Sequence, residues 1–285
     1  MRNNQDRFGA PGSPEQGDSP IPFTQENSST FSYAVPTEMV ELPSKGRFYP
    51  SDHPLHNVIE VQIRHMTAKD EDILTSQSLI KRGIVLDKLL ESVLFDKRIK
   101  TEDLLVGDKN ALILACRRYG YGQFYEAKIN CPSCSEDIDC EFDIEKWKFK
   151  KDPNLEELVV TQTENGTFLI TLPVSAVQVE FKLLSGADEN KINAIEERNK
   201  KMNLPSANST NTIKAIVVSV DGSYDASNIF FFAENIPASD ARYLRNTYNK
   251  VCPDIDVTSE FSCQNCGFTG AVEVPLNIDF FWPEQ

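Results

Sequence analysis

Two Cys-x-x-Cys pairs are the residues of this sequence whose types and spacing are best suited to chemistry. The first is Cys131-Pro-Ser-Cys134, and the second is Cys263-Gln-Asn-Cys266 followed by a glycine. Two intervening residues allow a tight turn to aim both sulfurs at one point. Four thiolates at about 2.3 Å from one ion form the closed tetrahedral set of a structural Zn²⁺ site. The sequence therefore predicts a structural zinc ion with Cys131, Cys134, Cys263 and Cys266 as its ligands.

The two pairs are far apart in the chain, since residues 135–262 separate them. A strand-like stretch follows each pair, at 138–142 and at 271–274, as in a zinc ribbon. We therefore expect a discontinuous four-cysteine zinc ribbon formed by residues 129–146 and 258–278. An ion that closes a loop of this length lowers the entropy of the unfolded chain. This effect stabilises the folded state by roughly 4 to 5 kcal/mol, in addition to the strength of the metal bonds themselves.

Other interpretations of the cysteines stay open. A redox pair is normally a single Cys-x-x-Cys at the start of a helix, whereas both pairs here lie in turns between predicted strands. Two unrelated pairs of reduced thiols are a further alternative. Packing is the expected role of Cys116 and Cys140, and Cys252 is ambiguous. Whether Cys140 or Cys252 joins a metal site is left undecided.

Residue patterns typical of catalysis are sparse. The three histidines, His53, His56 and His65, all precede residue 66, and the stretch Asp52–His56 fits a solvated loop better than a metal site. No Ser-His-Asp arrangement, P-loop or dinucleotide fingerprint occurs in its required strand and helix context. We therefore predict no enzymatic activity. A zinc metalloenzyme is the less favoured alternative, because it needs an open position on the metal.

Composition and charge argue against several classes of partner. The chain has 285 residues with 43 acidic and 29 basic side chains, which give a formal charge of -14 and a pI near 4.7. This charge repels phosphate backbones, so no nucleic acid partner is expected. The amino terminus lacks an apolar signal, and no apolar run approaches about 20 residues, so no membrane contact is expected. Seven cysteines cannot all pair within one chain, which fits the reducing cytosol.

The elements that must position the cysteines begin after a tail. Residues 1–38 are rich in Gly, Pro, Ser, Asn and Gln, and they are predicted to be a disordered tail. Residues 39–128 are predicted to be an N-terminal α+β module of strands and a helical stretch. In this module Thr67–Asp70 has the spacing of a capping box, and Val85–Leu94 has an apolar stripe at helical spacing. Helices are expected over 67–82, 85–94 and 108–119.

Residues 129–285 are predicted to be a β-rich half that contains the zinc ribbon. Asn165-Gly166 supplies the positive φ angles that a tight hairpin turn needs. Helices are expected over 187–201 and 239–248. The stretch 213–220 has features of both helix and strand and is left undecided. The predicted fold class is α+β.

Several phrases from residue 39 to the end form a further pattern. They are Glu41–Gly46, Tyr49-Pro50, Met66–Leu74, Asp103–Leu112, Gly120–Gly122, the two cysteine pairs and Phe280–Pro283. Together they resemble the baseplate hub and tail assembly protein family of T-even-type contractile-tailed bacteriophages. The resemblance implies a non-enzymatic structural or assembly role at the baseplate hub, with other hub or tape-measure proteins as partners. It fixes neither the oligomeric state nor the subunits contacted.

The resemblance leaves two questions open. Of the phrases shared with the family, only the two cysteine pairs indicate a functional site. Asp70, Glu71, Asp72 and Asp108 are candidates for a contact face. The helix with Leu89 and Leu90, followed by residues 103–119, is also similar to small phage tail chaperones. A transient tail assembly chaperone for the tape-measure or hub proteins is therefore the alternative function. We expect the chain in the host cytoplasm during assembly and, as a hub subunit, in the virion tail baseplate.

Overall fold

The computed structural model describes residues 34–274, 276 and 278–281 of the chain. The described residues from Val35 onward form one compact unit, whose fold class is α+β, as the sequence predicts. Most of the predicted tail, residues 1–38, lies outside the described residues. Thr37 and Glu38 are described and belong to the first strand, so this strand begins ahead of the boundary that we expected.

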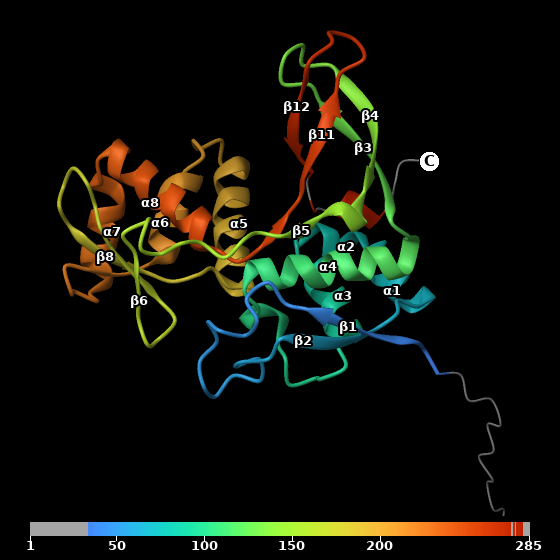
Figure 1. Ribbon diagram of the computed structural model, residues 1–285, viewed down its shortest axis with the longest axis horizontal. Coiled ribbons are helices and arrows are strands. Elements are labelled where there is room, and N and C mark those ends of the chain that lie inside the picture. The colour runs from blue at the N-terminus through green and yellow to red at the C-terminus, as the bar shows by residue number, and fades with distance from the viewer. Residues whose placement is uncertain (1–33, 275, 277, 282–285) are drawn as a thin grey trace, which may run out of the picture. The chain divides into compact units, whose positions relative to one another are not determined.

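The N-terminal module combines a two-stranded sheet with helices (Figure 1). Strands β1 (Thr37–Glu41) and β2 (Glu60–Arg64) are antiparallel, with Val40 opposite Val61. The helices are α1 (Ala68–Leu74), α2 (Gln77–Lys81), α3 (Val85–Val93), a 3-10 turn η2 (Thr101–Asp103) and α4 (Val106–Tyr121). Several apolar side chains of the module are wholly inaccessible to solvent, namely those of Leu42, Leu74, Leu89, Leu90, Val93 and Leu112. The apolar stripe of α3 therefore belongs to the core of this chain.

The stretch predicted as one helix over 67–82 is two helices. Thr67 starts α1 with the predicted capping box, in which its N–H and its hydroxyl both donate to Asp70 Oδ2 over 2.8 Å. The prediction was wrong at Thr75, whose hydroxyl donates to the Glu71 carbonyl, and at the extended Ser76 that starts α2. Hydroxyl side chains that bond to nearby backbone compete with the helix in this way.

A four-stranded antiparallel sheet and four helices make up most of the second half. The sheet order is β6 (Thr161–Gln162), β7 (Phe168–Thr171), β8 (Gln178–Phe181) and β9 (Val217–Val220). The helices are α5 (Gly186–Lys201), α6 (Asn208–Ile216), α7 (Ala226–Asn235) and α8 (Ala238–Val251). Gly166 has a φ of 75° in the predicted hairpin turn, where Thr163 N–H donates to the Thr167 carbonyl over 2.9 Å.

The undecided stretch 213–220 contains both kinds of element. Helix α6 buries Ile213 and Ile216, and the chain then becomes extended at Val217. Helix α7 was not predicted, and its start is capped by Asp225, whose carboxylate accepts from the Ser227 N–H.

No helix among the described residues is long and apolar enough to cross a membrane.

Two antiparallel hairpins form the ribbon that carries the cysteine pairs. One consists of β3 (Phe124–Asn130) and β4 (Asp137–Asp143), and the other of β11 (Thr258–Ser262) and β12 (Thr269–Glu273). Figure 1 shows the two hairpins side by side with their turns at the same end. After β4 come a 3-10 turn η3 (Ile144–Lys146) and β5 (Lys148–Phe149), which pairs with β10 (Ile255–Asp256). This short pair joins the segments that leave the first hairpin and enter the second.

Arg117 of α4 anchors the base of the ribbon. Its side chain is only 1% exposed, and Nη2 donates to the Phe124 carbonyl at the start of β3 over 2.8 Å. Nε donates to the Phe280 carbonyl over 2.9 Å, in the 3-10 turn η4 (Ile278–Phe281). The Phe280 ring packs edge-on against Tyr125 with centroids 4.7 Å apart. These contacts attach both the first hairpin and the C-terminal turn to α4.

Candidate metal centre

Each cysteine pair lies in the turn of one hairpin, and the two turns have the same backbone pattern. In the first, the Cys131 N–H donates to the carbonyl five residues on over 2.9 Å, and its own carbonyl accepts from the Ser135 N–H. In the second, the Cys263 N–H donates to the carbonyl five residues on over 2.8 Å, and its own carbonyl accepts from the Gly267 N–H. The two halves of the site are therefore built alike, although they come from distant parts of the chain.

The residue after each pair is in the left-handed region. Gly267 has a φ of 72°, which is favourable for glycine, and Ser135 has a φ of 60°, which is not favourable for serine. Ser135 was not among the residues predicted for the site. An alignment of the two pairs on their cysteines would have placed it opposite the glycine.

The four sulfurs converge between the two turns. Cys131 Sγ lies 3.7 Å from Cys266 Sγ, and Cys134 Sγ lies 3.7 Å from Cys263 Sγ. All four Sγ atoms lie within 4.8 Å of one another, and all are free thiols. Four sulfurs at the tetrahedral zinc distance would be about 3.8 Å apart, so this donor set fits one Zn²⁺ ion. The structure thus brings together the four cysteines that the sequence singled out.

The surroundings of Cys131 and Cys134 shift the pKa values of their thiols in opposite directions. Burial disfavours the thiolate of Cys131, but hydrogen bonds from the Cys134 and Ser133 backbone outweigh it and lower the pKa of Cys131 to about 7. A hydrogen bond from the backbone at Glu136 favours the thiolate of Cys134. Burial and the hydrogen bonds with the neighbouring thiols outweigh it and raise the pKa of Cys134 to about 12. Four thiolates this close repel one another, and a divalent cation between them would offset that repulsion.

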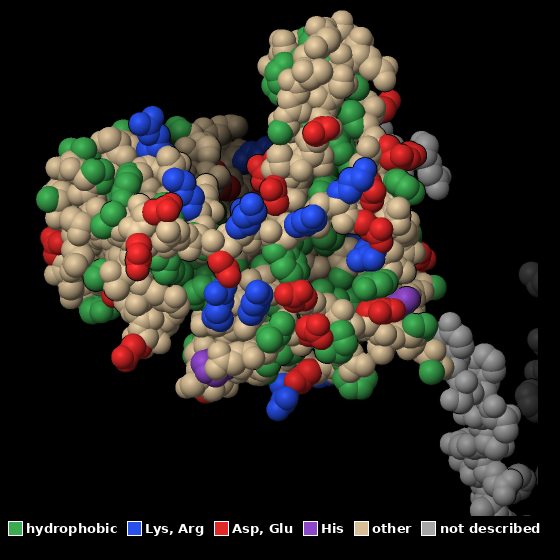
Figure 2. All heavy atoms as spheres, in the orientation of Figure 1, with side chains coloured by type: hydrophobic (Ala, Val, Ile, Leu, Met, Phe, Trp, Pro, Cys, Tyr) green, Lys and Arg blue, Asp and Glu red, His purple; other side chains and the backbone are tan. Residues whose placement is uncertain are grey.

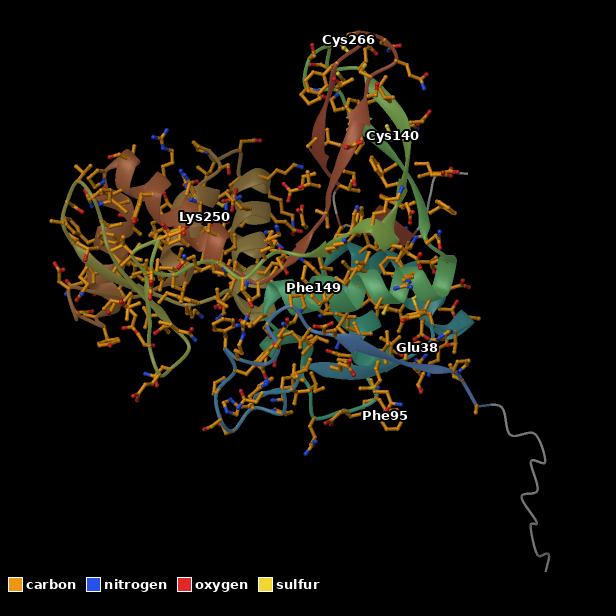
Figure 3. All side chains as sticks on the ribbon, in the orientation of Figure 1. Glu38, Phe95, Cys140, Phe149, Lys250 and Cys266 are labelled. Carbon is orange, nitrogen blue, oxygen red and sulfur yellow. The ribbon has the colours of Figure 1, made fainter. Side chains whose placement is uncertain are left out.

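The other cysteines lie outside this cluster. Cys116 is buried on α4, where burial raises its pKa to about 12. Cys140 is half-buried in β4, and Figure 3 shows it further from the tip of the ribbon than Cys266. Burial also raises the pKa of Cys252 to about 11. Among the residues that the structure describes, the four clustered cysteines are the only group of three or more side chains placed to share a metal ion.

The histidines of the loop before β2 hydrogen-bond within that loop. His56 Nδ1 lies 2.7 Å from the Tyr49 carbonyl, and His53 Nδ1 accepts from the Leu55 N–H over 3.1 Å. These contacts agree with the interpretation of Asp52–His56 as a loop.

Two of the acidic residues proposed for a contact face are buried, so that expectation was wrong for them. The side chains of Asp70 and Asp108 are wholly inaccessible to solvent. Asp108 accepts from the Ser44 hydroxyl over 2.6 Å and from the Tyr49 hydroxyl over 2.8 Å. Burial raises the pKa of Asp108, although these hydrogen bonds oppose the rise. Its carboxyl group secures the loop after β1 to α4.

Comparison with known proteins identifies the family. The model of the T4 bacteriophage base plate protein family matches residues 35–282 of the chain. No curated protein and no solved structure matches it. The match covers the module, the sheet and both hairpins of the ribbon. The chain therefore belongs to the T4 bacteriophage base plate protein family, which implies a structural role in a phage baseplate, other baseplate proteins as partners and a place in the virion tail.

Proposed function

We propose that this chain is a non-enzymatic structural subunit of the baseplate hub, with a ribbon closed by one Zn²⁺ ion bound to Cys131, Cys134, Cys263 and Cys266. The single observation that carries the zinc proposal is the convergence of four Sγ atoms within 4.8 Å. The placement at the hub is supported by the phrases shared with hub proteins of T-even-type phages, beyond the family assignment itself.

The donor set supports a structural ion. Four sulfurs fill the tetrahedral coordination that zinc adopts in structural sites, which leaves no position for water or substrate. A zinc metalloenzyme would need such a position and is therefore disfavoured. The ion would also connect two hairpins that the chain otherwise joins only through residues 144–257. We infer that its role is to hold the ribbon together as a contact surface for assembly.

The chaperone alternative receives less support. It rested on the likeness of the helix that contains Leu89 and Leu90, followed by residues 103–119, to small phage tail chaperones. A chaperone would need such an apolar stripe to be exposed to its client. Both side chains are wholly buried within this chain, so the stripe is not free to hold a tape-measure protein.

Purified virions provide the test, because a hub subunit remains in the particle and a chaperone leaves it. Mass spectrometry of intact, gradient-purified virions is expected to find this chain in fixed ratio to the other baseplate proteins. Absence from virions, together with recovery on tape-measure protein in lysates, would establish the chaperone instead. X-ray absorption at the zinc edge is expected to show four sulfur neighbours at about 2.3 Å. A light-atom neighbour in place of a sulfur would reopen the metalloenzyme interpretation.

A further inference from the structure

Strand β1 has a free edge. The Leu42 N–H donates to the Ile59 carbonyl, and the His65 N–H donates to the Pro36 carbonyl, over 2.8 Å in each case. In an antiparallel pair the residues that face the partner strand alternate. The N–H and C=O groups of Met39 and Glu41 therefore point away from β2. Among the described residues, no hydrogen bond reaches the N–H of either one.

A groove lies along this free edge. It has a volume of about 230 Å³ and is lined on one side by Met39 and Glu41. Apolar side chains of α4 and of the segment after the first hairpin line much of the rest, including Ala111, Leu114, Ala115, Ile144, Trp147 and Phe149. Arg118 and Glu145 also line it and form an ion pair with each other over 2.7 Å. Figure 1 shows α4 between β1 and β5, and Figure 2 shows hydrophobic side chains at the surface of this region between acidic and basic ones. The groove thus offers unpaired backbone groups beside a wall of apolar side chains and one internal ion pair, which leaves Glu41 as the lining charge without an ion-pair partner in the part of the chain that the structure describes.

Such an edge selects an extended chain as its ligand. A peptide in β conformation pairs its backbone with the edge strand, and every second side chain points the same way. A helical ligand would leave the N–H groups of Met39 and Glu41 without partners. Natural edge strands that remain unpaired are often protected by charged side chains, proline or a bulge; Met39 provides none of these, whereas Glu41 provides one charge.

The charge at one end of the groove indicates what the ligand carries there. Glu41 lies directly opposite Glu60 across the β1–β2 pair. Like charges in this arrangement destabilise a sheet, and among the described residues neither carboxylate has an ion-pair partner. A lysine or arginine on the ligand would neutralise the pair. The overall charge of -14 also favours a basic partner.

We propose that the groove beside β1 binds an extended segment of a partner baseplate protein, with apolar residues at alternating positions and a basic residue beside Glu41. The identity of the partner as a baseplate protein rests on the proposed function. The binding chemistry does not, because it involves neither the cysteine cluster nor the virion.

The test is a selection with a defined probe. A library of random peptides of about ten residues is selected on the full, metal-loaded chain, and the affinities of enriched peptides are measured by fluorescence anisotropy. We expect enriched peptides to alternate apolar and polar residues and to carry a lysine or arginine near one end. Enrichment of no peptide, or of peptides with helical apolar spacing, would overturn the proposal.

Two variants and two controls localise the binding. Met39→Pro removes an N–H that points into the groove and no hydrogen bond to β2, so affinity should fall about tenfold or more. Thr37→Pro removes an outward N–H from the same strand beyond the groove and should leave the affinity unchanged. Met39→Ala removes only the side chain and should reduce the affinity less than Met39→Pro does. Leu114→Glu places a charge in the groove without altering β1 and should also abolish binding, which keeps the test decisive if Met39→Pro fails to fold. Equal affinity of Leu114→Glu and the wild type would refute the site.

A truncated chain identifies the occupant. If deletion of residues 1–33 increases peptide affinity about tenfold, the chain's own N-terminal segment fills the groove, and a partner segment is ruled out as its resident. We expect the affinity of the truncated chain to match that of the full chain. Zinc content and recovery from virions are measured separately, so failure here leaves the proposed function standing.

Discussion

The N-terminal module and the ribbon are stabilised in different ways. Helix α3 alone buries Val85, Leu89, Leu90 and Val93. Each strand of the ribbon buries only one or two side chains, such as Phe142 of β4, Phe261 of β11 and Val272 of β12. A two-stranded hairpin with so little apolar burial is marginal in water by itself. We therefore expect apolar packing to stabilise the module, whereas the ribbon relies on the Arg117 contacts at its base and, under the proposed function, on an ion bound by its sulfurs.

The comparison also shows where each region places its ionisable groups. In the module, the buried carboxylate of Asp70 has a guanidinium beside it, with Arg64 Nη1 at 2.6 Å and Arg64 Nη2 at 2.9 Å. In the ribbon, four thiols face one another. Pairing with a side chain completes the first arrangement, while the second is a donor set that a cation from outside the chain would complete.

Loss of one of the four clustered sulfurs should have the largest effect on the stability of the ribbon relative to the module. Cys263→Ser should abolish zinc binding, which contributes on the order of 10 kcal/mol in small zinc domains. Amide hydrogens of β3, β4, β11 and β12 should then exchange faster with solvent, while those of α3 and α4 keep their protection. Hydrogen exchange with mass spectrometry, together with metal analysis, checks both parts.

Cys140→Ser is the matched control, since Cys140 lies in the same ribbon and outside the cluster. It should retain the metal and the slow exchange of all four strands. Complete loss of zinc from Cys263→Ser with unchanged exchange in the ribbon would mean that the two regions do not differ in the way described.

The sequence predicted those features that depend on neighbouring residues. The capping box at Thr67, the hairpin at Gly166 and the turns of the cysteine pairs each occupy a few consecutive residues, and all three are confirmed. The convergence of the pairs was predictable for a different reason. Two Cys-x-x-Cys pairs are typical of a structural zinc site, so the residue types predicted that the pairs converge although they are distant in the sequence.

Features that depend on distant contacts were missed. Nothing near Asp108 in the sequence shows that this acid is buried, because its partners Ser44 and Tyr49 lie 64 and 59 residues away and reach it only in the folded chain. The role of Arg117 is similar, since one of its acceptors is the Phe280 carbonyl. For Asp70 the predicted capping box was a local signal that its carboxylate is engaged at the start of α1, and this signal was not applied to the contact-face hypothesis.

The groove beside β1 belongs to the same class. Its walls come from residues 39–41, 111–119, 144–149 and 255, and no periodicity in any one segment reveals it.

The Arg64–Asp70 pair gives a test of intermediate size on the module side. Burial opposes the charge on Asp70, but hydrogen bonds from Arg64, Ser92 and Thr67 outweigh it and hold the pKa of Asp70 below its usual 3.8. The pair therefore stabilises the module above pH 3.8, and this stability is lost as the pH falls through the lower pKa of the folded state. Asp70→Asn should cost about 3 kcal/mol at neutral pH and should make stability less dependent on pH in the acidic range.

Urea titrations at pH 6 and pH 3, followed through the methyl resonances of Leu89 and Leu90, measure the module without the ribbon. Asp72→Asn is the control, because Asp72 is an exposed acid on the same helix, and it should change stability by less than about 0.5 kcal/mol. Equal pH dependence in the wild type and Asp70→Asn would show that the module does not rely on this ion pair.

The smallest expected effect tests whether the two turns of the ribbon are equivalent. An added Cβ at Gly267 meets no atom within 4 Å, so a side chain there is opposed only by the φ of 72°. Gly267→Ser should therefore destabilise its turn by about 1 kcal/mol, and Ser135→Gly should relieve the other turn by about 0.5 to 1 kcal/mol. Because binding and folding of the turns are coupled, competition with a chelator should show zinc affinity lowered about fivefold by the first change and raised by the second. Ser133→Gly, within the first turn but outside the left-handed region, should not raise the affinity. Unchanged zinc affinity in one of the two variants would mean that the two turns are not equivalent, and that one hairpin forms before the metal binds.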